Sequence, residues 1–255
     1  LLPNHAHSPL EIVHYLPLTL PFSLYLNSPI DLRESLKVQR VEFQSFNLQS
    51  ILHWLPGSAF THNNTVYFVQ YKISHGIPPL YYSFEYGQKE WTNKEECWGI
   101  YEIFCDLTNE TSDVEEPYYG RVKATSAHIH TPWSMTKRFS PWLETKIGPP
   151  SISVIQSGRS IQLILQAPNS PYKDRKGRNK SLKDYYDLIY RVFIINNSQD
   201  MKRKLYEGTN EKIEMDIKPG ANYCVAAEMY LFELNRSSES TEICTFKIQR
   251  NGMYI

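Results

Sequence analysis

The sequence predicts an all-β protein built from two consecutive β-sandwiches, and three observations support this. Short runs of alternating apolar and polar residues recur along the chain, about seven in each half of roughly 100 residues, as in a sandwich. Helical periodicity is sustained nowhere. A connector containing Pro141, Pro149 and Pro150 separates the two halves. Proline has no backbone N–H to donate to a strand ladder, so these residues end the strands of the first half.

The composition is that of a globular protein without an enzyme's motifs. With 255 residues, 41% of them apolar, each half can bury a core of its own. The formal net charge is zero, so no global field attracts nucleic acid or an anionic membrane. The sequence holds no GxSxG, no HExxH and no glycine-rich phosphate loop. We therefore expect a protein that is not an enzyme and that uses no cofactor.

The first half, residues 35–145, is expected to begin its strands at Leu36. Apolar residues then alternate with polar ones, and Trp54 is expected in the core. In residues 116–126 one set of side chains faces inward and the other outward. Residues 91–98 and 101–107 bracket two cysteines and are interpreted as a hairpin. Further strands are expected at 51–55, 65–73 and 118–125, with a second extended run from Trp133.

The second half, residues 146–255, repeats this layout with different residues. A loop at 168–183 carries six basic side chains, and the strand at 185–195 is the longest. Other strands are expected at 152–155, 160–167, 204–206, 212–217, 222–231 and 241–248. A tyrosine opens a late strand in each half, at Tyr118–Tyr119 and at Tyr223. Such a tyrosine either closes a corner between sheets through its hydroxyl or is an ordinary strand residue.

Cysteines and glycosylation signals indicate an oxidising compartment. Four cysteines allow three pairings, and the local one, Cys97 with Cys105 and Cys224 with Cys244, is favoured because each pair then lies within one half. Neither pair has metal-ligand spacing. The Asn-x-Ser/Thr signal for N-glycosylation occurs five times, at Asn63, Asn109, Asn179, Asn196 and Asn235. These features predict a secreted glycoprotein.

The first 34 residues are expected to lie outside the fold. Their longest apolar stretch, residues 15–26, is too short for a membrane span and contains Pro17 and Pro21. We interpret this segment as a poorly ordered leader or as the remnant of a signal peptide.

Seven motifs carry a family resemblance. They are VYFVQYKI (66–73), NKEECWG (93–99), CDLTNETSD (105–113), EPYYGRV (116–122), WSMTKRFSPWLETKIGPP (133–150), DYYDLIYRVFIINNS (184–198) and YCVAAEMY (223–230). In this order and spacing they resemble the extracellular module of class II cytokine receptors, from about Ser35 to Phe246. They are most similar to a secreted member that binds interleukin-22.

The resemblance implies two tandem fibronectin type III-like domains joined at an elbow that holds a helical cytokine, here interleukin-22. The protein would act as a monomeric decoy that keeps the cytokine from its membrane receptor. The loop ends at the junction become the candidate contacts. They are Tyr86, Gly87, Gln88, Asp113, His128, Ile129, His130, Tyr172, Asp174, Leu231 and Phe232. Packing on its own domain is the alternative role for Phe232.

The chain departs from the family pattern in three places. Residues 74–85 are inserted directly before Tyr86 and are able to move or mask it. The leader does not match, and His128–His130 replaces a small, tyrosine-containing tip. The sequence therefore leaves two alternatives to a cytokine-binding decoy. One is a variant in which the insertion abolishes cytokine binding, and the other is the ectodomain of a membrane receptor.

Two further roles concern side chains outside the cytokine contacts. The six basic residues of 168–183 form either a solvated loop or a site for sulfated glycosaminoglycan. His128 and His130 are two positions apart in a strand-like segment, so both side chains would face the same side and could bind one metal ion. No third ligand is apparent in the sequence.

Overall fold

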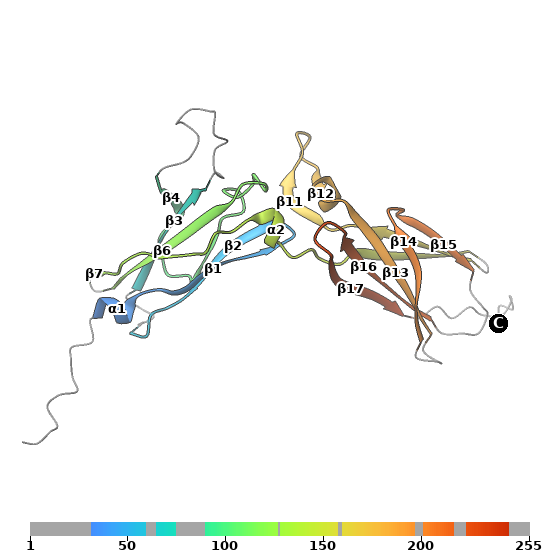
Figure 1. The fold of residues 1–255 in the computed structure, drawn as a ribbon, viewed down its shortest axis with the longest axis horizontal. Helices are drawn as coiled ribbons and strands as arrows, with labels where there is room; N and C mark the ends of the chain where they lie inside the picture. The colour runs from blue at the N-terminus through green and yellow to red at the C-terminus, as the bar shows by residue number, and fades with distance from the viewer. Residues whose placement is uncertain are drawn as a thin grey trace, which may run out of the picture.

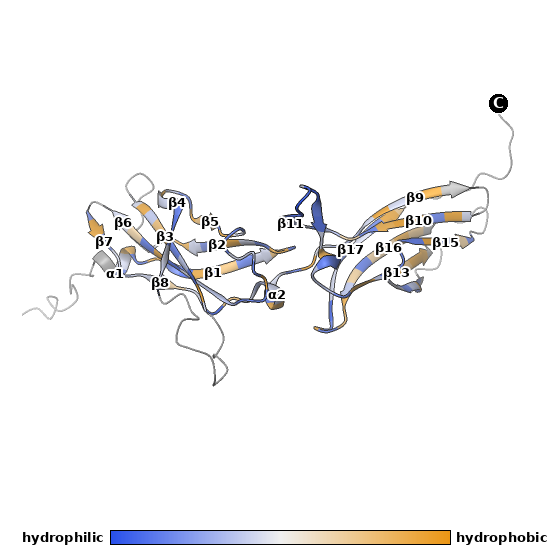
Figure 2. Ribbon diagram, turned by 90° about the horizontal axis from the view of Figure 1, so that it is seen from above, coloured by the Kyte–Doolittle hydropathy of each residue, from blue (hydrophilic) through white to orange (hydrophobic). Residues whose placement is uncertain are grey.

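The computed structural model describes residues 32–59, 65–74, 90–126, 128–157, 160–196, 201–216 and 223–244. Figure 1 shows two β domains arranged end to end and meeting at an angle. The predicted all-β architecture is confirmed. Polar and apolar residues alternate along the strands, and β11 (Asn169–Lys173), at the junction, is largely hydrophilic (Figure 2).

The first domain is a sandwich of a three-stranded and a five-stranded sheet. The first sheet has the order β1 (Gln39–Phe46), β2 (Gln49–Leu55), β5 (Phe104–Asp106). The second has the order β4 (Thr92–Ile100), β3 (Thr65–Ile73), β6 (Tyr118–Ser126), with β7 (Ile129–His130) and β8 (Ser134–Met135) both paired to β6. Burial alternates along all of β6, as its sequence predicts. The apolar side chains so turned inward build the core, which includes Trp54, Tyr67 and Val122.

The predicted hairpin around the first cysteine pair is wrong. The strand β4 pairs with β3, whereas β5 pairs with β2 in the other sheet. The chain leaves β4 beyond Gly99, which has a φ of 88° that favours glycine, and crosses to the opposite layer. The disulfide Cys97–Cys105 therefore joins the two sheets of the sandwich.

The second domain repeats the sandwich with a second disulfide. One sheet has the order β15 (Lys212–Asp216), β10 (Ser160–Gln166), β9 (Ser151–Ser157). The other has the order β14 (Met201–Gly208), β13 (Leu188–Asn196), β16 (Tyr223–Leu231), β17 (Arg236–Cys244). Cys224 and Cys244 are direct partners across β16 and β17 and form a disulfide. The local pairing predicted for both cysteine pairs is confirmed.

The segment predicted as a basic loop is ordered. The strands β11 and β12 (Asn179–Ser181) pair as a two-stranded ribbon, followed by the 3-10 turn η1 (Leu182–Asp184). Tyr185 and Tyr186 both donate their backbone N–H to Leu182 O, at 3.1 Å each. Because these bonds close a helical turn, β13 begins at Leu188 and not at Tyr185.

The tyrosine corner of the first domain is confirmed. The Tyr118 hydroxyl donates to the backbone oxygen of Asp113 at 2.9 Å, and burial raises the pKa of this phenol. The Tyr223 side chain lies outside the described part of the structure. Two short helices, α1 (Leu32–Leu36) and α2 (Pro141–Glu144), complete the fold. Within the described ranges, neither helix has the length and apolar content to cross a membrane.

Candidate functional site: the elbow between the domains

The two domains meet at a junction that we call the elbow. It consists of the β1–β2 turn, the loop 107–117, the linker 145–150, the β11–β12 ribbon and the β16–β17 turn. The linker runs beside the end of β1. Lys146 donates its backbone N–H to Ser45 O at 2.9 Å and accepts from Asn47 N at 2.8 Å, and Gly148 N donates to Asn47 Oδ1 at 2.7 Å. The linker is thereby held against the first domain.

Residues of the first domain extend the core of the second. Leu48 is fully buried at the β1–β2 turn, and Val114 is buried in the loop before β6. Both belong to the apolar cluster that contains Leu188 and Leu231 of the second domain. A continuous apolar core across the elbow resists hinge motion, because opening it exposes these side chains to water.

Tyr172, expected among the cytokine contacts, holds the domains together instead. Its hydroxyl lies 3.0 Å from Thr108 O and 3.4 Å from both Leu48 O and Thr111 O, all in the first domain. All three partners are carbonyl oxygens, so the hydroxyl is the donor. Burial is the main reason that its pKa rises to about 12. The side chain is committed to the elbow and is not a free anchor.

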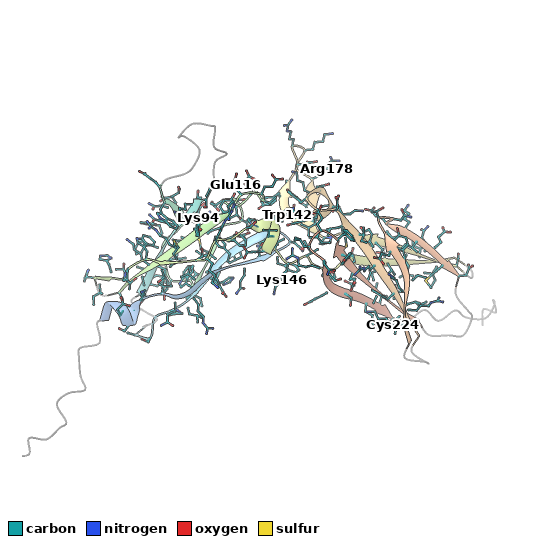
Figure 3. The ribbon with its side chains drawn as sticks, viewed as in Figure 1. Lys94, Glu116, Trp142, Lys146, Arg178 and Cys224 are labelled. Carbon is teal, nitrogen blue, oxygen red and sulfur yellow. A yellow bond between two sulfur atoms is a disulfide. The ribbon has the colours of Figure 1, made fainter. Side chains whose placement is uncertain are left out.

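An aromatic pair makes a second connection. The rings of Trp142 in α2 and Tyr186 stack with centroids 5.7 Å apart. The Tyr186 hydroxyl donates to Trp142 O at 3.1 Å, and Trp142 N donates to Val114 O at 3.1 Å. Figure 3 shows Trp142 at the junction. This pair is not among the residues predicted from the sequence, although a large aromatic residue within a proline-rich connector was a signal for it.

We expect Tyr172→Phe to destabilise the protein by about 1 kcal/mol, the usual net value of one hydrogen bond. The ring stays in place, so the change isolates the hydroxyl that bridges the domains. The free energy of unfolding in urea measures it. Tyr101→Phe is the control, because Tyr101 is mostly exposed. Equal unfolding midpoints for Tyr172→Phe and the parent protein would contradict the assigned role.

Phe232 is the most exposed apolar side chain at the elbow. It lies in the β16–β17 turn, and 76% of it is accessible to water. Its ring and that of Tyr230 form a T-shaped pair, with centroids 6.4 Å apart. A phenylalanine this exposed, beside a buried interdomain core, is a candidate anchor for a protein partner.

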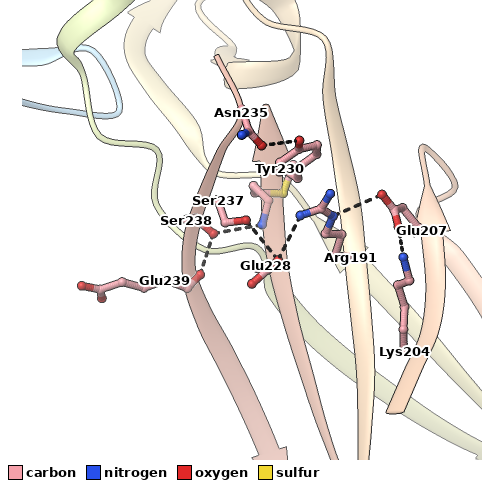
Figure 4. Close-up of polar contacts among 10 residues, drawn as sticks. Arg191, Lys204, Glu207, Glu228, Tyr230, Asn235, Ser237, Ser238 and Glu239 are labelled. Carbon is pink, nitrogen blue, oxygen red and sulfur yellow. Dashed lines mark hydrogen bonds and ion pairs between the residues drawn. The ribbon is translucent and has the colours of Figure 1, made fainter. Parts of the chain in front are cut away.

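The turn that presents Phe232 is held in shape. Asn235 donates its backbone N–H to Phe232 O at 3.1 Å, and its Oδ1 accepts from the Tyr230 hydroxyl at 2.9 Å (Figure 4). The guanidinium of Arg191 lies 3.3 Å from the centre of the Tyr230 ring. Arg191 is itself fixed by ion pairs to Glu207 and Glu228 (Figure 4). A turn already ordered loses less entropy on binding.

Charge is divided between the two sides of the elbow. The loop 107–117 of the first domain carries Asp113, Glu115 and Glu116, whereas the ribbon of the second domain carries the basic residues. Figure 3 shows Glu116 and Arg178 on opposite sides of the junction. The Asp174 carboxylate, another expected contact, accepts from Lys176 N at 2.8 Å and Arg178 N at 2.9 Å and so closes the ribbon's turn.

Two of the remaining expected contacts, Leu231 and the segment His128–His130, do not assemble with Phe232. Leu231 is fully buried in the second domain's core, because its strand turns it inward. The segment His128–His130 lies at the opposite end of the first domain, where β7 pairs with the last residues of β6 (Figure 1). Tyr86, Gly87 and Gln88 lie outside the described residues, as do most of the insertion, the leader up to residue 31 and Asn63.

Three other glycosylation candidates are exposed near the elbow. Asn109 lies in the loop 107–117, Asn179 begins β12 and Asn235 is in the β16–β17 turn. The side chain of Asn196 lies outside the described part. Within the described ranges, Cys224, Glu242 and Cys244 form the one close group of three potential metal ligands. Its two sulfurs are joined in a disulfide and so offer no thiolate.

Comparison with known proteins places the chain among cytokine receptors. Residues 16–133 match the family described as tissue factor, and residues 145–247 match the fibronectin type III domain of interferon-alpha/beta receptors. Human interleukin-22 receptor subunit alpha-2 is 50% identical over 230 residues, which cover 82% of this chain and 88% of the relative. The chain belongs to the class II cytokine receptor family.

Other cytokine receptors match at lower identity. The mouse alpha-2 subunit is 45% identical over 88% of its length. Human interleukin-22 receptor subunit alpha-1 is 35% identical, and the match covers 72% of this chain but 31% of that relative. A crystal structure of the chicken interferon gamma receptor alpha chain superposes with a TM-score of 0.60 at 21% identity, over 83% of this chain and 98% of that one. This likeness supports the two-domain receptor fold.

Proposed function

We propose that this protein is a secreted decoy receptor that binds interleukin-22 at the elbow and keeps it from the membrane receptor. The observation that carries the proposal is the 50% identity to human interleukin-22 receptor subunit alpha-2 across 88% of that relative. The membrane-receptor alternative is less favoured, because the identity to human subunit alpha-1 is lower, at 35%. The domain boundary would fall within the linker, between Thr145 and Lys146.

The cytokine would rest on residues at the junction ends of both domains. Phe232 supplies an exposed apolar anchor on the second domain. Asp113 supplies an exposed acidic group on the first domain. The segment that contains Tyr86, Gly87 and Gln88 leaves β3 after Ile73, which pairs with Tyr118 at the start of β6. It therefore leaves the sheet at the end that also bears Asp113. This surface does not include Leu231, Tyr172 or the segment 128–130.

Binding of the purified full-length chain to immobilised interleukin-22 tests the proposal. We expect saturable binding that blocks the ectodomain of the membrane receptor, both for the full chain and for a variant lacking residues 74–85. The insertion should be tolerated, because the entropy of closing a loop rises only slowly with its length. Binding by the shortened variant alone would contradict the proposal for the full chain. No binding by either form, when both unfold cooperatively, would contradict the assigned ligand.

A further inference from the structure

The β11–β12 ribbon concentrates positive charge, and this feature has no part in the proposed cytokine contacts. Within residues 173–183, which we call the basic hairpin, only Asp174 is acidic. The basic side chains are Lys173, Arg175, Lys176, Arg178, Lys180 and Lys183. Figure 3 shows Arg178 near the outer end of this projection, on the side of the second domain that faces the elbow.

The single carboxylate of the basic hairpin is used to shape its turn. Asp174 accepts from two backbone N–H groups, as described above, and pairs with the Arg178 guanidinium at 2.8 Å. These hydrogen bonds, led by the one from the Arg178 backbone, lower the pKa of Asp174. The turn is therefore fixed near neutral pH, and Asp174 neutralises one of the six cations.

Three cations of the basic hairpin remain available. Lys173, Arg175 and Lys176 are exposed, and none forms an ion pair with a residue in the described ranges. By contrast, Lys180 lies over the Tyr185 ring and Lys183 pairs with Glu211. The free cations stand together at the turn, so their mutual repulsion is relieved when a multivalent anion binds them.

The basic hairpin lacks the side chains that anchor a protein partner. Protein interfaces depend on a few buried aromatic or large apolar residues. The one aromatic residue of β11, Tyr172, is committed to the elbow. A flexible polyanion, in contrast, needs only closely spaced cations, and arginine binds such oxyanions through two parallel N–H donors.

We propose that the basic hairpin binds a sulfated glycosaminoglycan. The free ammonium and guanidinium groups of Lys173, Arg175 and Lys176 would contact successive sulfates. The acidic loop 107–117 across the elbow repels the same polymer, so the binding site is confined to the second domain. A secreted receptor with this site would be retained at cell surfaces and in matrix. The site does not depend on cytokine binding.

Retention of the full chain on immobilised heparin, eluted with a salt gradient, tests the proposal. We expect the triple variant Lys173→Ala/Arg175→Ala/Lys176→Ala to elute at markedly lower salt. The slope of log affinity against log salt concentration should fall by up to about three, one for each lost contact, by analogy with counterion release from nucleic acid. Chemically desulfated heparin should retain neither protein.

A charge-matched variant controls for net charge. Lys202→Ala/Arg203→Ala/Lys204→Ala removes the same three residue types from β14, all of them exposed, and should elute with the parent protein. Both variants keep the glycosylation signal at Asn179, so glycan shielding is equal. Equal losses in the two variants, or no loss in the hairpin variant, would overturn the proposal. So would a hairpin variant that loses only interleukin-22 affinity, because the basic hairpin would then belong to the cytokine surface.

Discussion

Replacing Phe232 with alanine should weaken interleukin-22 binding by about 2 kcal/mol or more, roughly 30-fold in Kd. The ring is 76% exposed in the free protein, so its apolar surface is removed from water only when a partner covers it. The surrounding turn is already ordered by Tyr230 and Asn235, which reduces the entropy lost on binding. The loss should appear mainly as faster dissociation, measured by surface plasmon resonance.

Stability measurements separate this effect from misfolding. Because the Phe232 ring is largely exposed, Phe232→Ala should leave the melting midpoint unchanged. Phe104→Ala provides a matched control: Phe104 is 48% exposed, but it lies in β5 and outside the residues that form the elbow. We expect Phe104→Ala to bind as the parent protein does. Unchanged affinity in Phe232→Ala, or the same loss in Phe104→Ala, would remove Phe232 from the contact surface.

Replacing Trp54 with alanine should destabilise the first domain by about 3–5 kcal/mol, the usual cost of truncating a large core aromatic residue. Trp54 is 2% exposed and packs against Tyr67, with ring centroids 5.4 Å apart. It lies in the same cluster as the Cys97–Cys105 disulfide, between the two sheets. The cavity left by alanine cannot close easily, because strands on both sides hold the sheets apart. The free energy of unfolding, measured by chemical denaturation and then by calorimetry, gives the size of this loss.

A conservative change provides the control for Trp54. Within the described part of the chain, no group accepts a hydrogen bond from Trp54 Nε1. Trp54→Phe removes this buried donor and keeps most of the apolar ring, so we expect a much smaller loss of stability than with alanine. Equal losses for the two substitutions would show that volume at this position is not what matters.

Local patterns in the sequence determined much of this architecture. A period of two identifies strands and their inward faces, because successive side chains in a strand point to opposite sides. It therefore placed Trp54 in the core and predicted the alternating burial of β6. Because two cysteines lie in each half, their positions were sufficient to predict both disulfides. The order and spacing of the motifs were sufficient to identify the receptor family.

Only the tertiary structure decided which strands are partners and which exposed-looking residues are buried. Alternation carries no information on pairing, so β4 and β5 were placed in one hairpin although they belong to different sheets. Tyr172 and Leu231 lie next to loops in sequence, but the first is half-buried with its hydroxyl bonded to the other domain, and the second is buried in its own domain's core. Contacts such as that of Tyr172 with Thr108 join residues 64 positions apart. Such contacts depend on how two complete domains dock, and no local stretch of sequence encodes that arrangement.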